Sequence, residues 1–495
     1  MIARVLRRPC WPLAALIAVY TFAYSLLCWA RFSSFHAQID FSYYLRLAWG
    51  LGHGFYDLPL VQARHVLGLH LEPIVLPLAL LGRLGIALPP LLIVSQALCV
   101  ALSAWPAYRI AARHLGPPHL PTVVAGMTGA LLALLYPTVT VATLHDFHPV
   151  TLALAPLLAL LDTLDEAEQS APSPAALRRL RRRAVLWGAL SLACREDIAL
   201  QLACVLAAYT LLRRWPVLMT PASADAPAIW RGRAVAATIC LALFAYCFIY
   251  LLWIQPRYVP AQGSYNLHFA KVGAAVGGEV HSSRDLVLLA LRHPVRVIVA
   301  LLDRERILYP ILLLWPVAGL ALLAPRALAG TLPVLAINFL SGFPRVLRLE
   351  SHYTTALVPF IVAAGLVGAG RALRITARRD TLASQPGPSP RPSGAAIWVI
   401  ASLLCGALSA HGYHGGSPLS LWGDRFAWPL FRDPDDAPAL RRLIAAVPPA
   451  ASIAARPGPL AHLAQRPRAI SPPEYDDGQP VDVVLPPVVL PSPRR

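Results

Sequence analysis

Charged side chains are scarce in this sequence of 495 residues: Asp, Glu, Lys and Arg make up only 14% of it, where a soluble domain carries about 25%. Hydrophobic residues make up 57%, and the mean hydropathy is +0.57. This balance leaves too little charge for a soluble surface and excludes a string of soluble domains. Apolar stretches of about 20 residues, each long enough to cross the hydrocarbon core of a bilayer, recur along the chain. The sequence therefore predicts an all-α polytopic membrane protein.

Lysine is almost absent. Lys271 is the only lysine, so 42 of the 43 basic residues are Arg, against 25 acidic residues and a net charge of +18. A basic chain can indicate a nucleic-acid partner, but here the Arg clusters flank apolar stretches, as at 178–183. This is the distribution of the positive-inside rule, in which basic loops stay cytoplasmic and face anionic lipids. We therefore expect membrane lipids, and no nucleic acid, as partners.

Motifs for paired cysteines and for nucleotide binding are also missing. The eight cysteines lie mostly inside apolar runs without paired spacing, which is typical of small buried side chains and excludes a disulfide framework or a cysteine zinc site. The chain has no phosphate-binding glycine loop, no dinucleotide fingerprint and no H-E-x-x-H motif. Any reaction must therefore draw its energy from the substrate itself or from an ion gradient.

Hydropathy and the Arg clusters together predict eleven spans. The Arg clusters at 4–8, 109–113, 178–183, 213–214 and 371–379 fall on one side of the membrane when the chain crosses it eleven times. This places the N-terminus in the cytoplasm and the C-terminus outside, in a multi-pass protein of the cell (plasma or inner) membrane. The first span is expected to stay uncleaved, because no small-residue cleavage site follows it. The predicted spans are about 11–30, 89–110, 121–142, 150–163, 184–194, 198–212, 233–254, 307–324, 327–342, 354–370 and 395–410.

The chain divides into a transmembrane domain, 1–410, and a Pro-rich external tail, 411–495. Within the first, 31–88 is too often interrupted by charge to span, and we expect a long external loop with short helices on the membrane surface. The apolar stretch 284–306 is studded with Arg, which favours an interfacial helix. The Arg-, Pro- and Ser-rich stretch 371–393 is expected to be a cytoplasmic loop. The tail is expected to form a small α/β module or to stay extended.

With this topology the acids and histidines beside the hydrocarbon gather on the external side. Ionisable groups near a membrane core are costly, which makes them candidates for function. Five separate loops contribute them, so they could line one cavity. The residues are Asp40, His70, Glu72, His145, Asp146, His148, Glu196, Asp197, Arg345, Arg348, Glu350, His352 and Tyr353.

Several of these residues have a plain structural alternative. Asp40 could cap a helix or act as a catalytic carboxylate. His145 and His148 have the spacing of half a metal site, but no certain third ligand accompanies them, so headgroup binding and local structure stay open. Glu196 and Asp197 could be an acid–base pair or partners for a neighbouring Arg.

The two arginines that precede His352 also have two possible roles. Arg345 and Arg348 could clamp a phosphate group or contact external lipid headgroups. His352 and Tyr353, which follow them, carry little information alone.

The order and spacing of these blocks resemble a bacterial membrane family known as domain-of-unknown-function family 2079. The similarity covers roughly 35–370 and, more weakly, the tail. The family opens with an Asp-led block, of which this chain keeps Asp40, Trp49 and Gly54. The matching segments are 40-DFSYYLRLAWGLGHG-54, 70-HLEPIVLPL-78, 146-DFHP-149, 195-RED-197 and 352-HY-353.

The chain departs from the family pattern at three positions of the first block. Ser42 replaces a Gly, Leu45 replaces a second Asp, and Arg46 replaces a Gln. Any role of that Asp–Gln pair is therefore in doubt here, and Asp40 is the better candidate.

The family in turn resembles the GT-C class of membrane glycosyltransferases. That resemblance implies a long first external loop with an essential acid, a polyprenyl-phosphate sugar as donor, and a glycan, lipid or protein acceptor outside the membrane. It implies Asp40 as the general base and Arg345 or Arg348 as the group that stabilises the leaving phosphate. The expected substrate-binding residues are His70, Glu72, His145, Asp146, His148, Glu196, Asp197, Arg345, Arg348, His352 and Tyr353.

No cofactor is certain from the sequence, although the same acids and histidines could hold a divalent metal ion. Two other functions stay open. A polytopic transporter would also carry charge within the membrane, and a non-catalytic membrane protein could keep the same fold.

Overall fold

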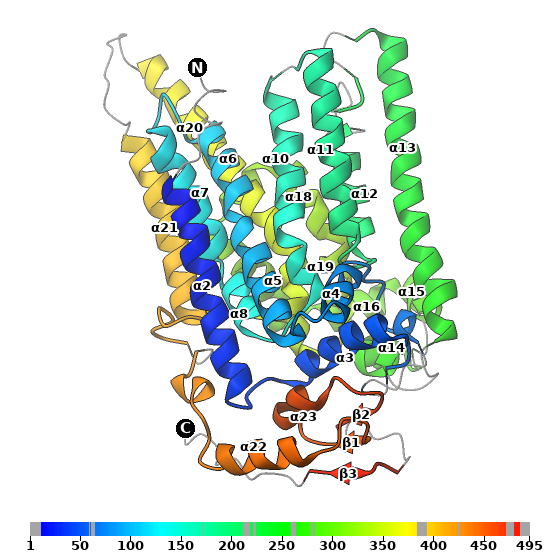
Figure 1. Ribbon diagram of the computed structural model, residues 1–495. Coiled ribbons are helices and arrows are strands. Elements are labelled where there is room, and N and C mark those ends of the chain that lie inside the picture. Colours follow the sequence, from blue (N-terminus) through cyan, green and yellow to red (C-terminus); the bar gives the residue numbers. More distant parts are fainter. Residues whose placement is uncertain are drawn as a thin grey trace.

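The protein is mostly helical, with one small sheet at its C-terminal end (Figure 1). The computed structural model describes residues 11–485 except 59, 61–64, 171, 211–217, 221–223, 259–263, 279, 281–282, 384–393, 424–425 and 472–479. The predicted Arg clusters at 4–8 and 213–214 and residues 384–393 of the predicted loop lie outside the described residues. Residues 371–383, expected to belong to that loop, instead continue the helix that begins at Val358.

Long apolar helices confirm the predicted class of polytopic membrane protein. Five helices are long and apolar enough to span, and a sixth candidate is a pair bent by 52°. The bend falls where Tyr136 leaves helical geometry before Pro137, which cannot continue the hydrogen-bond ladder of the preceding helix. The count of eleven spans stays a prediction. The candidates are α2 (Trp11–Ser33), α5 with α6 (Leu88–Leu102 and Ala104–His114), α13 (Ala226–Ile249, extended to Arg257), the segment His352–Ala377 at the start of α20 (Val358–Ala383), α21 (Gly394–His414), and the bent pair α7 and α8 (Thr122–Leu135 and Pro137–Leu144).

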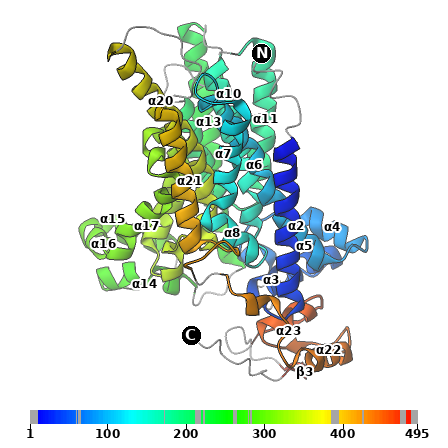
Figure 2. The same cartoon turned by 90° about the vertical axis from the view of Figure 1, so that its left-hand side faces the viewer.

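Shorter helices complete the bundle (Figures 1 and 2). Some are apolar and some carry charge on one end, so hydropathy alone finds them less readily. They are α9 (Pro149–Leu152), α10 (Leu154–Ser170), α11 (Pro174–Leu192), α12 (Ile198–Thr210), α17 (Arg304–Leu314), α18 (Pro325–Leu328) and α19 (Leu332–Leu340).

The predicted span 307–324 is interrupted halfway. After α17 the chain passes through two 3-10 turns, η5 (Trp315–Val317) and η6 (Leu320–Leu323), separated by two residues with positive φ. Irregular backbone at membrane depth is tolerated only where protein surrounds it. Here α20 covers it closely, because a Cβ added at Gly368 would lie 1.9 Å from the carbonyl oxygen of Leu320. A helix with larger side chains on this face could not approach the broken segment.

Short helices gather at one end of the bundle, at the bottom of Figure 1. Short helices occur in 31–88 as expected, and the stretch 284–306 forms two helices instead of one because a proline follows His293. Their place at the membrane surface stays a prediction. The helices are α3 (Ile39–His53), α4 (Val75–Arg83), α14 (Ser264–Val276), α15 (Ser283–Arg292) and α16 (Pro294–Leu301).

The tail forms a small α/β module. Its three strands, β1 (Ile453–Ala454), β2 (Ala469–Ile470) and β3 (Val483–Val484), pair in parallel in the order β2-β1-β3. The helices α22 (Ala437–Ala446) and α23 (Pro457–Leu463) accompany them.

The module packs on α3 at the same end of the bundle as the short helices (Figure 1). Arg46, whose side chain is fully buried, donates from Nη2 to the carbonyl oxygen of Pro467 at 2.9 Å and lies 3.3 Å from Asp57. His462 Nε2 donates to the carbonyl oxygen of Phe32 at 2.9 Å. The residue that replaces the family's Gln therefore binds the tail to α3.

A buried ionic cluster joins α6, α10 and α11. Asp162 is completely buried and lies 2.8 Å from Arg109, 2.5 Å from Arg113 and 3.3 Å from Arg183. Glu166, one helical turn further along α10, lies 2.7 Å from Arg183. Charges in a low-dielectric interior are tolerated only when they are paired in this way.

We expect Asp162→Asn to destabilise the protein, because it leaves buried guanidinium groups without their main counter-charge. Removal of one partner from a buried ion pair costs about 3–5 kcal/mol, so the apparent Tm of the protein in detergent should fall by several degrees. Glu166→Gln is the matched comparison, since its side chain is 32% exposed and loss of a partly exposed pair costs less than loss of a fully buried one. Equal shifts for the two variants would contradict this ranking.

The predicted orientation can be tested in the full-length chain with two exposed positions at opposite ends. We expect a membrane-impermeant maleimide to label Asp435→Cys in intact cells and to label Arg179→Cys only after permeabilisation, because the Arg-rich end is predicted to be cytoplasmic. The unsubstituted protein gives the background of its native cysteines. Labelling in the reverse pattern would overturn the topology.

Candidate functional site

The carboxylate of Asp146 positions the start of α3. It accepts hydrogen bonds from the backbone N–H groups of Gln38 and Phe41, each at 3.1 Å, and it is buried. The cap of α3 therefore comes from a residue more than 100 positions away, since the side chain of Gln38 makes no capping bond. Asp40 is thereby free of the capping role that the sequence left open for it.

Gln96, in the middle of an apolar span, holds the loop that carries Asp146 and His148. Its side-chain oxygen accepts from the backbone N–H of His148 at 2.9 Å and from the hydroxyl of Thr151 at 2.8 Å. Its amide nitrogen lies within 3.3 Å of the carbonyl oxygen of Asp146. Sequence reasoning missed Gln96. The signal was available, because a single amide in an apolar span needs buried partners.

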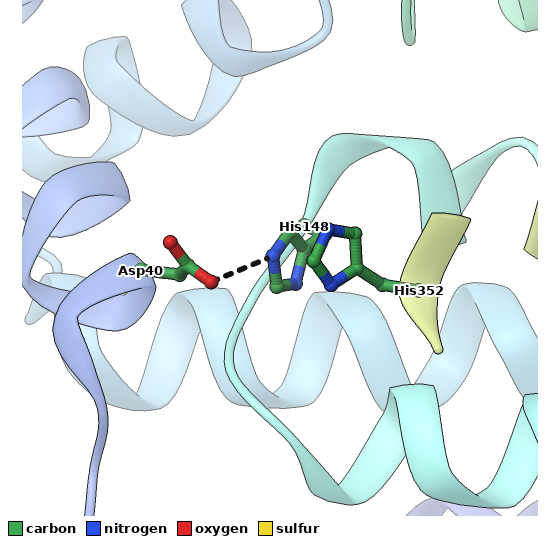
Figure 3. A group of neighbouring side chains, drawn as sticks. All are labelled: Asp40, His148 and His352. Carbon is green, nitrogen blue, oxygen red and sulfur yellow. Dashed lines mark ion pairs between the residues drawn. The ribbon is translucent and has the colours of Figure 1, made fainter. Parts of the chain in front are cut away.

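Three side chains from three distant segments meet next to this loop: Asp40, His148 and His352 (Figure 3). Asp40 Oδ2 lies 3.3 Å from His148 Nε2. The imidazole rings of His148 and His352 stack, with centroids 4.1 Å apart and planes at 19°. The side chain of Asp40 is 40% exposed and that of His148 only 7%, so the trio opens on the side of Asp40.

The second ring nitrogen of His148 settles its hydrogen-bonding roles. Nδ1 lies 3.0 Å from the carbonyl oxygen of Asp146, which can only accept, so Nδ1 carries a hydrogen. In the neutral ring, Nε2 therefore presents its lone pair to the carboxylate of Asp40. This arrangement calls for a positive charge between the two groups, supplied by a proton on Nε2 or by a bound cation.

The charge balance of the trio follows from burial and from this pairing. Burial raises the pKa of Asp40, but the hydrogen bond and the charge of His148 outweigh it and hold the pKa well below its usual range. Burial alone would lower the pKa of His148, but the hydrogen bond to Asp40 and the negative charge of Asp40 outweigh burial, so the pKa is raised. His145, in the same loop, has no such partner, and burial lowers its pKa to about 4.

A second polar group lies on the far side of Tyr44. The ring of Tyr44 packs edge-on against His148, with centroids 5.6 Å apart, and its hydroxyl lies 3.1 Å from Glu72 Oε1. Burial raises the pKa of Glu72 to about 7. Tyr44 therefore connects the trio to the acids that follow, and the sequence analysis did not select it, because an aromatic residue at a membrane interface is common.

Glu196 and Asp197 complete this second group and are already engaged. Glu196 accepts from the backbone N–H of Leu71 at 2.9 Å and lies 2.9 Å from His70 Nδ1. Asp197 forms a bidentate pair with Arg195, at 2.6 and 2.5 Å. The sequence left open whether these two acids form an acid–base pair or bind a neighbouring Arg. In the structure Asp197 binds Arg195, and Glu196 binds a histidine, His70.

The last predicted residues lie in the segment that precedes α20. The ring of Tyr353 packs against that of His352, with centroids 4.1 Å apart and planes tilted by 35°. Arg345 and Arg348 are exposed, on and just after the 3-10 helix η8 (Pro344–Leu347). Neither forms an ion pair with a described residue.

The pair of His70 and Glu196 predicts a pH dependence. Burial lowers the pKa of His70, but Glu196 outweighs it and raises the pKa from 6.5 to about 9. The pair therefore stabilises the folded protein fully below about pH 6.5 and loses this effect as the pH rises through about 9. The Tm difference between the protein and its His70→Gln variant should be large at about pH 6 and small at about pH 9.5. A difference that stays constant or grows with pH would contradict the assignment.

Two solved structures are similar to this chain over most of its length. ArnT from Cupriavidus metallidurans bound to undecaprenyl phosphate aligns with a TM-score of 0.47 and 14% identity over 92% of this chain and 85% of that one. The Archaeoglobus fulgidus oligosaccharyltransferase, tethered to an acceptor peptide with an NVT sequon, aligns with a TM-score of 0.42 and 14% identity over 91% of this chain and 64% of that one. No curated protein sequence matches this chain. The family profile described as "Predicted membrane protein (DUF2079)" matches residues 31–485, and the chain therefore belongs to this family of predicted membrane proteins.

Proposed function

We propose that this protein is a membrane glycosyltransferase that transfers a sugar from a polyprenyl-phosphate donor to an acceptor at the external membrane face. The observation that carries the proposal is the position of Asp40: a partly exposed carboxylate held against His148 at the end of the bundle that bears the short helices. The resemblance of the sequence to the GT-C class points to the same acid.

Asp40 would take the proton from the acceptor. The acceptor oxygen attacks the anomeric carbon of the sugar, the bond from that carbon to the phosphate oxygen breaks, and polyprenyl phosphate leaves. The acceptor's hydroxyl proton passes to Asp40, whose second oxygen points away from His148 in Figure 3. The site holds the pKa of Asp40 below its usual range, which keeps it in the charged form that a proton acceptor needs. The configuration at the anomeric carbon would be inverted.

Arg345 and Arg348 are suited to the leaving phosphate. A guanidinium binds phosphate oxygens in a bidentate manner and stabilises the charge that grows on them in the transition state. Both side chains are exposed, without an ion-pair partner in the described part of the chain, and they precede His352 by only a few residues.

A cavity among apolar side chains would hold part of the polyprenyl chain. It has a volume of about 590 Å³ and lies between α12, α17, the broken segment that follows α17, α18, α19 and α20. Leucines supply much of its wall, and Ile361, in the first turn of α20, lines it as well. The polyprenyl tail is apolar, so this cavity suits it by burial of apolar surface.

The second polar group would bind sugar hydroxyls. One carboxylate oxygen of Glu72 accepts the hydroxyl of Tyr44, and one ring nitrogen of His70 is bonded to Glu196. The other carboxylate oxygen of Glu72 and the other ring nitrogen of His70 are left for a ligand. Glu196 and Asp197 would act mainly by holding His70 and Arg195 in place. Asp146 would act through α3, whose first turn it fixes.

The test compares Asp40→Asn with Asp435→Asn in membranes supplied with radiolabelled polyprenyl-phosphate hexoses and pentoses. A positioned general base contributes about 10²–10⁴-fold to rate, so the first variant should lose sugar transfer by about 100-fold or more at unchanged expression. Asp435, an exposed acid of the C-terminal module, should be replaceable without effect.

Two results would overturn the proposal. Full activity of a well-expressed Asp40→Asn variant would remove the base assignment. Failure of the unsubstituted protein to consume any donor of the panel would remove the donor class.

A further inference from the structure

We propose that Asp40, His148 and His352 form a binding site for one divalent cation of the zinc class. The donor atoms are one carboxylate oxygen and two imidazole nitrogens, and they all lie within 4.8 Å of one another. By its spacing the sequence paired only His145 with His148, as half of a site, because the other two ligands come from segments about 100 and 200 residues away.

The hydrogen bonding of His148 is that of a metal ligand. Its Nδ1–H donates to the carbonyl oxygen of Asp146 at 3.0 Å, which leaves Nε2 with a lone pair directed at the trio. Histidine ligands of metal ions donate their other ring N–H to a carbonyl or carboxylate in this way, which fixes the tautomer. A lone pair and a carboxylate oxygen 3.3 Å apart repel each other unless a positive charge lies between them.

His352 has donor capacity that nothing described uses. Its ring stacks on His148 and lies tilted against Tyr353, and neither ring nitrogen forms a hydrogen bond with a described residue. His352 and Asp40 are both half-buried, and His148 is the buried member of the trio.

The distances are close to those that zinc requires. Zn–N and Zn–O bonds of about 2.0–2.2 Å in a tetrahedron place ligand atoms about 3.4 Å apart. Asp40 and His148 already have this separation. The widest separation in the trio must close by about 1.4 Å, and rotation of the stacked His352 ring could bring this about.

The donor set favours zinc over magnesium. Two imidazoles and one carboxylate with a fourth position open is the pattern of catalytic zinc sites, whereas Mg²⁺ prefers oxygen ligands throughout. The fourth position would face the open side of the site, where a phosphate or hydroxyl oxygen of a substrate could bind. Asp40 would use Oδ2 for the ion and keep its other oxygen on the exposed side.

The test measures binding without any sugar donor. Full-length protein, purified in detergent through a tag without histidine and treated with EDTA, is titrated calorimetrically with ZnCl₂ and separately with MgCl₂. We expect one zinc ion per chain and no saturable binding of magnesium. Loss of an outer-shell partner already costs about 10–100-fold in metal affinity, so Asp40→Asn, His148→Gln and His352→Gln should each weaken zinc binding by at least about 100-fold.

His145→Gln is the matched control. It lies in the same loop as His148, three residues earlier, and it is not part of the trio, so its variant should bind zinc like the unsubstituted protein. His352→Gln removes only ring contacts and is the variant expected to keep the fold, which an unchanged Tm in EDTA would establish.

Absence of saturable zinc binding, or equal binding by the three variants and the control, would overturn the metal site. This outcome is distinguishable from failure of the proposed function, because zinc binding needs no donor and sugar transfer is measured separately in membranes.

Discussion

The site depends on the buried carboxylate of Asp146. Burial of a carboxylate is costly unless hydrogen bonds offset it, and here two backbone N–H groups at the start of α3 do so. The same residue uses its carbonyl oxygen to orient the ring of His148. One residue therefore fixes the direction of the helix that carries Asp40 and the tautomer of the histidine that faces it. Gln96 supports this residue from within an apolar span, and the position of the trio follows from these few bonds.

The protein has two groups of polar side chains, at opposite ends of the bundle, and they are arranged differently. At the end with α6, α10 and α11, the charges pair closely, and Asp162 is completely buried among guanidinium groups. Such a cluster holds helices together and leaves little free to bind a ligand. At the other end, Asp40, Glu72 and His70 each keep part of their side chain or one polar atom uncommitted. Only the second arrangement is suited to chemistry, which is the physical reason for placing the candidate site there.

Hydropathy predicted the simple spans well and the irregular ones poorly. The expected spans 11–30 and 395–410 correspond to the helices Trp11–Ser33 and Gly394–His414, because a continuous apolar run has one favourable conformation in a bilayer. The expected span 307–324 contains a helix only to Leu314. Its composition is equally apolar, and hydropathy does not register Pro316 and Gly319, where the helix breaks.

The sequence analysis named the three residues that the structure brings together, but not their grouping. The sequence analysis selected Asp40, His148 and His352 among thirteen residues, since ionisable groups near the membrane are rare. It could not pair them, because their contacts join segments more than 100 residues apart. It passed over Tyr44 and Gln96, whose residue types are unremarkable at an interface or in a helix until their hydrogen-bond partners are known.

The bond from Arg46 to Pro467 also sets an order of events in the cell. The two residues are 421 positions apart, so α3 is synthesised and reaches the membrane long before the ribosome has made the carbonyl group that receives its guanidinium. The side chain of Arg46 is fully buried in the finished protein. During synthesis, before Pro467 is made, it can pair only with residues near it in sequence, such as Asp57. The contact between α3 and the C-terminal module is therefore among the last parts of the protein to be assembled, and a nascent chain carries its transmembrane helices before this contact can form.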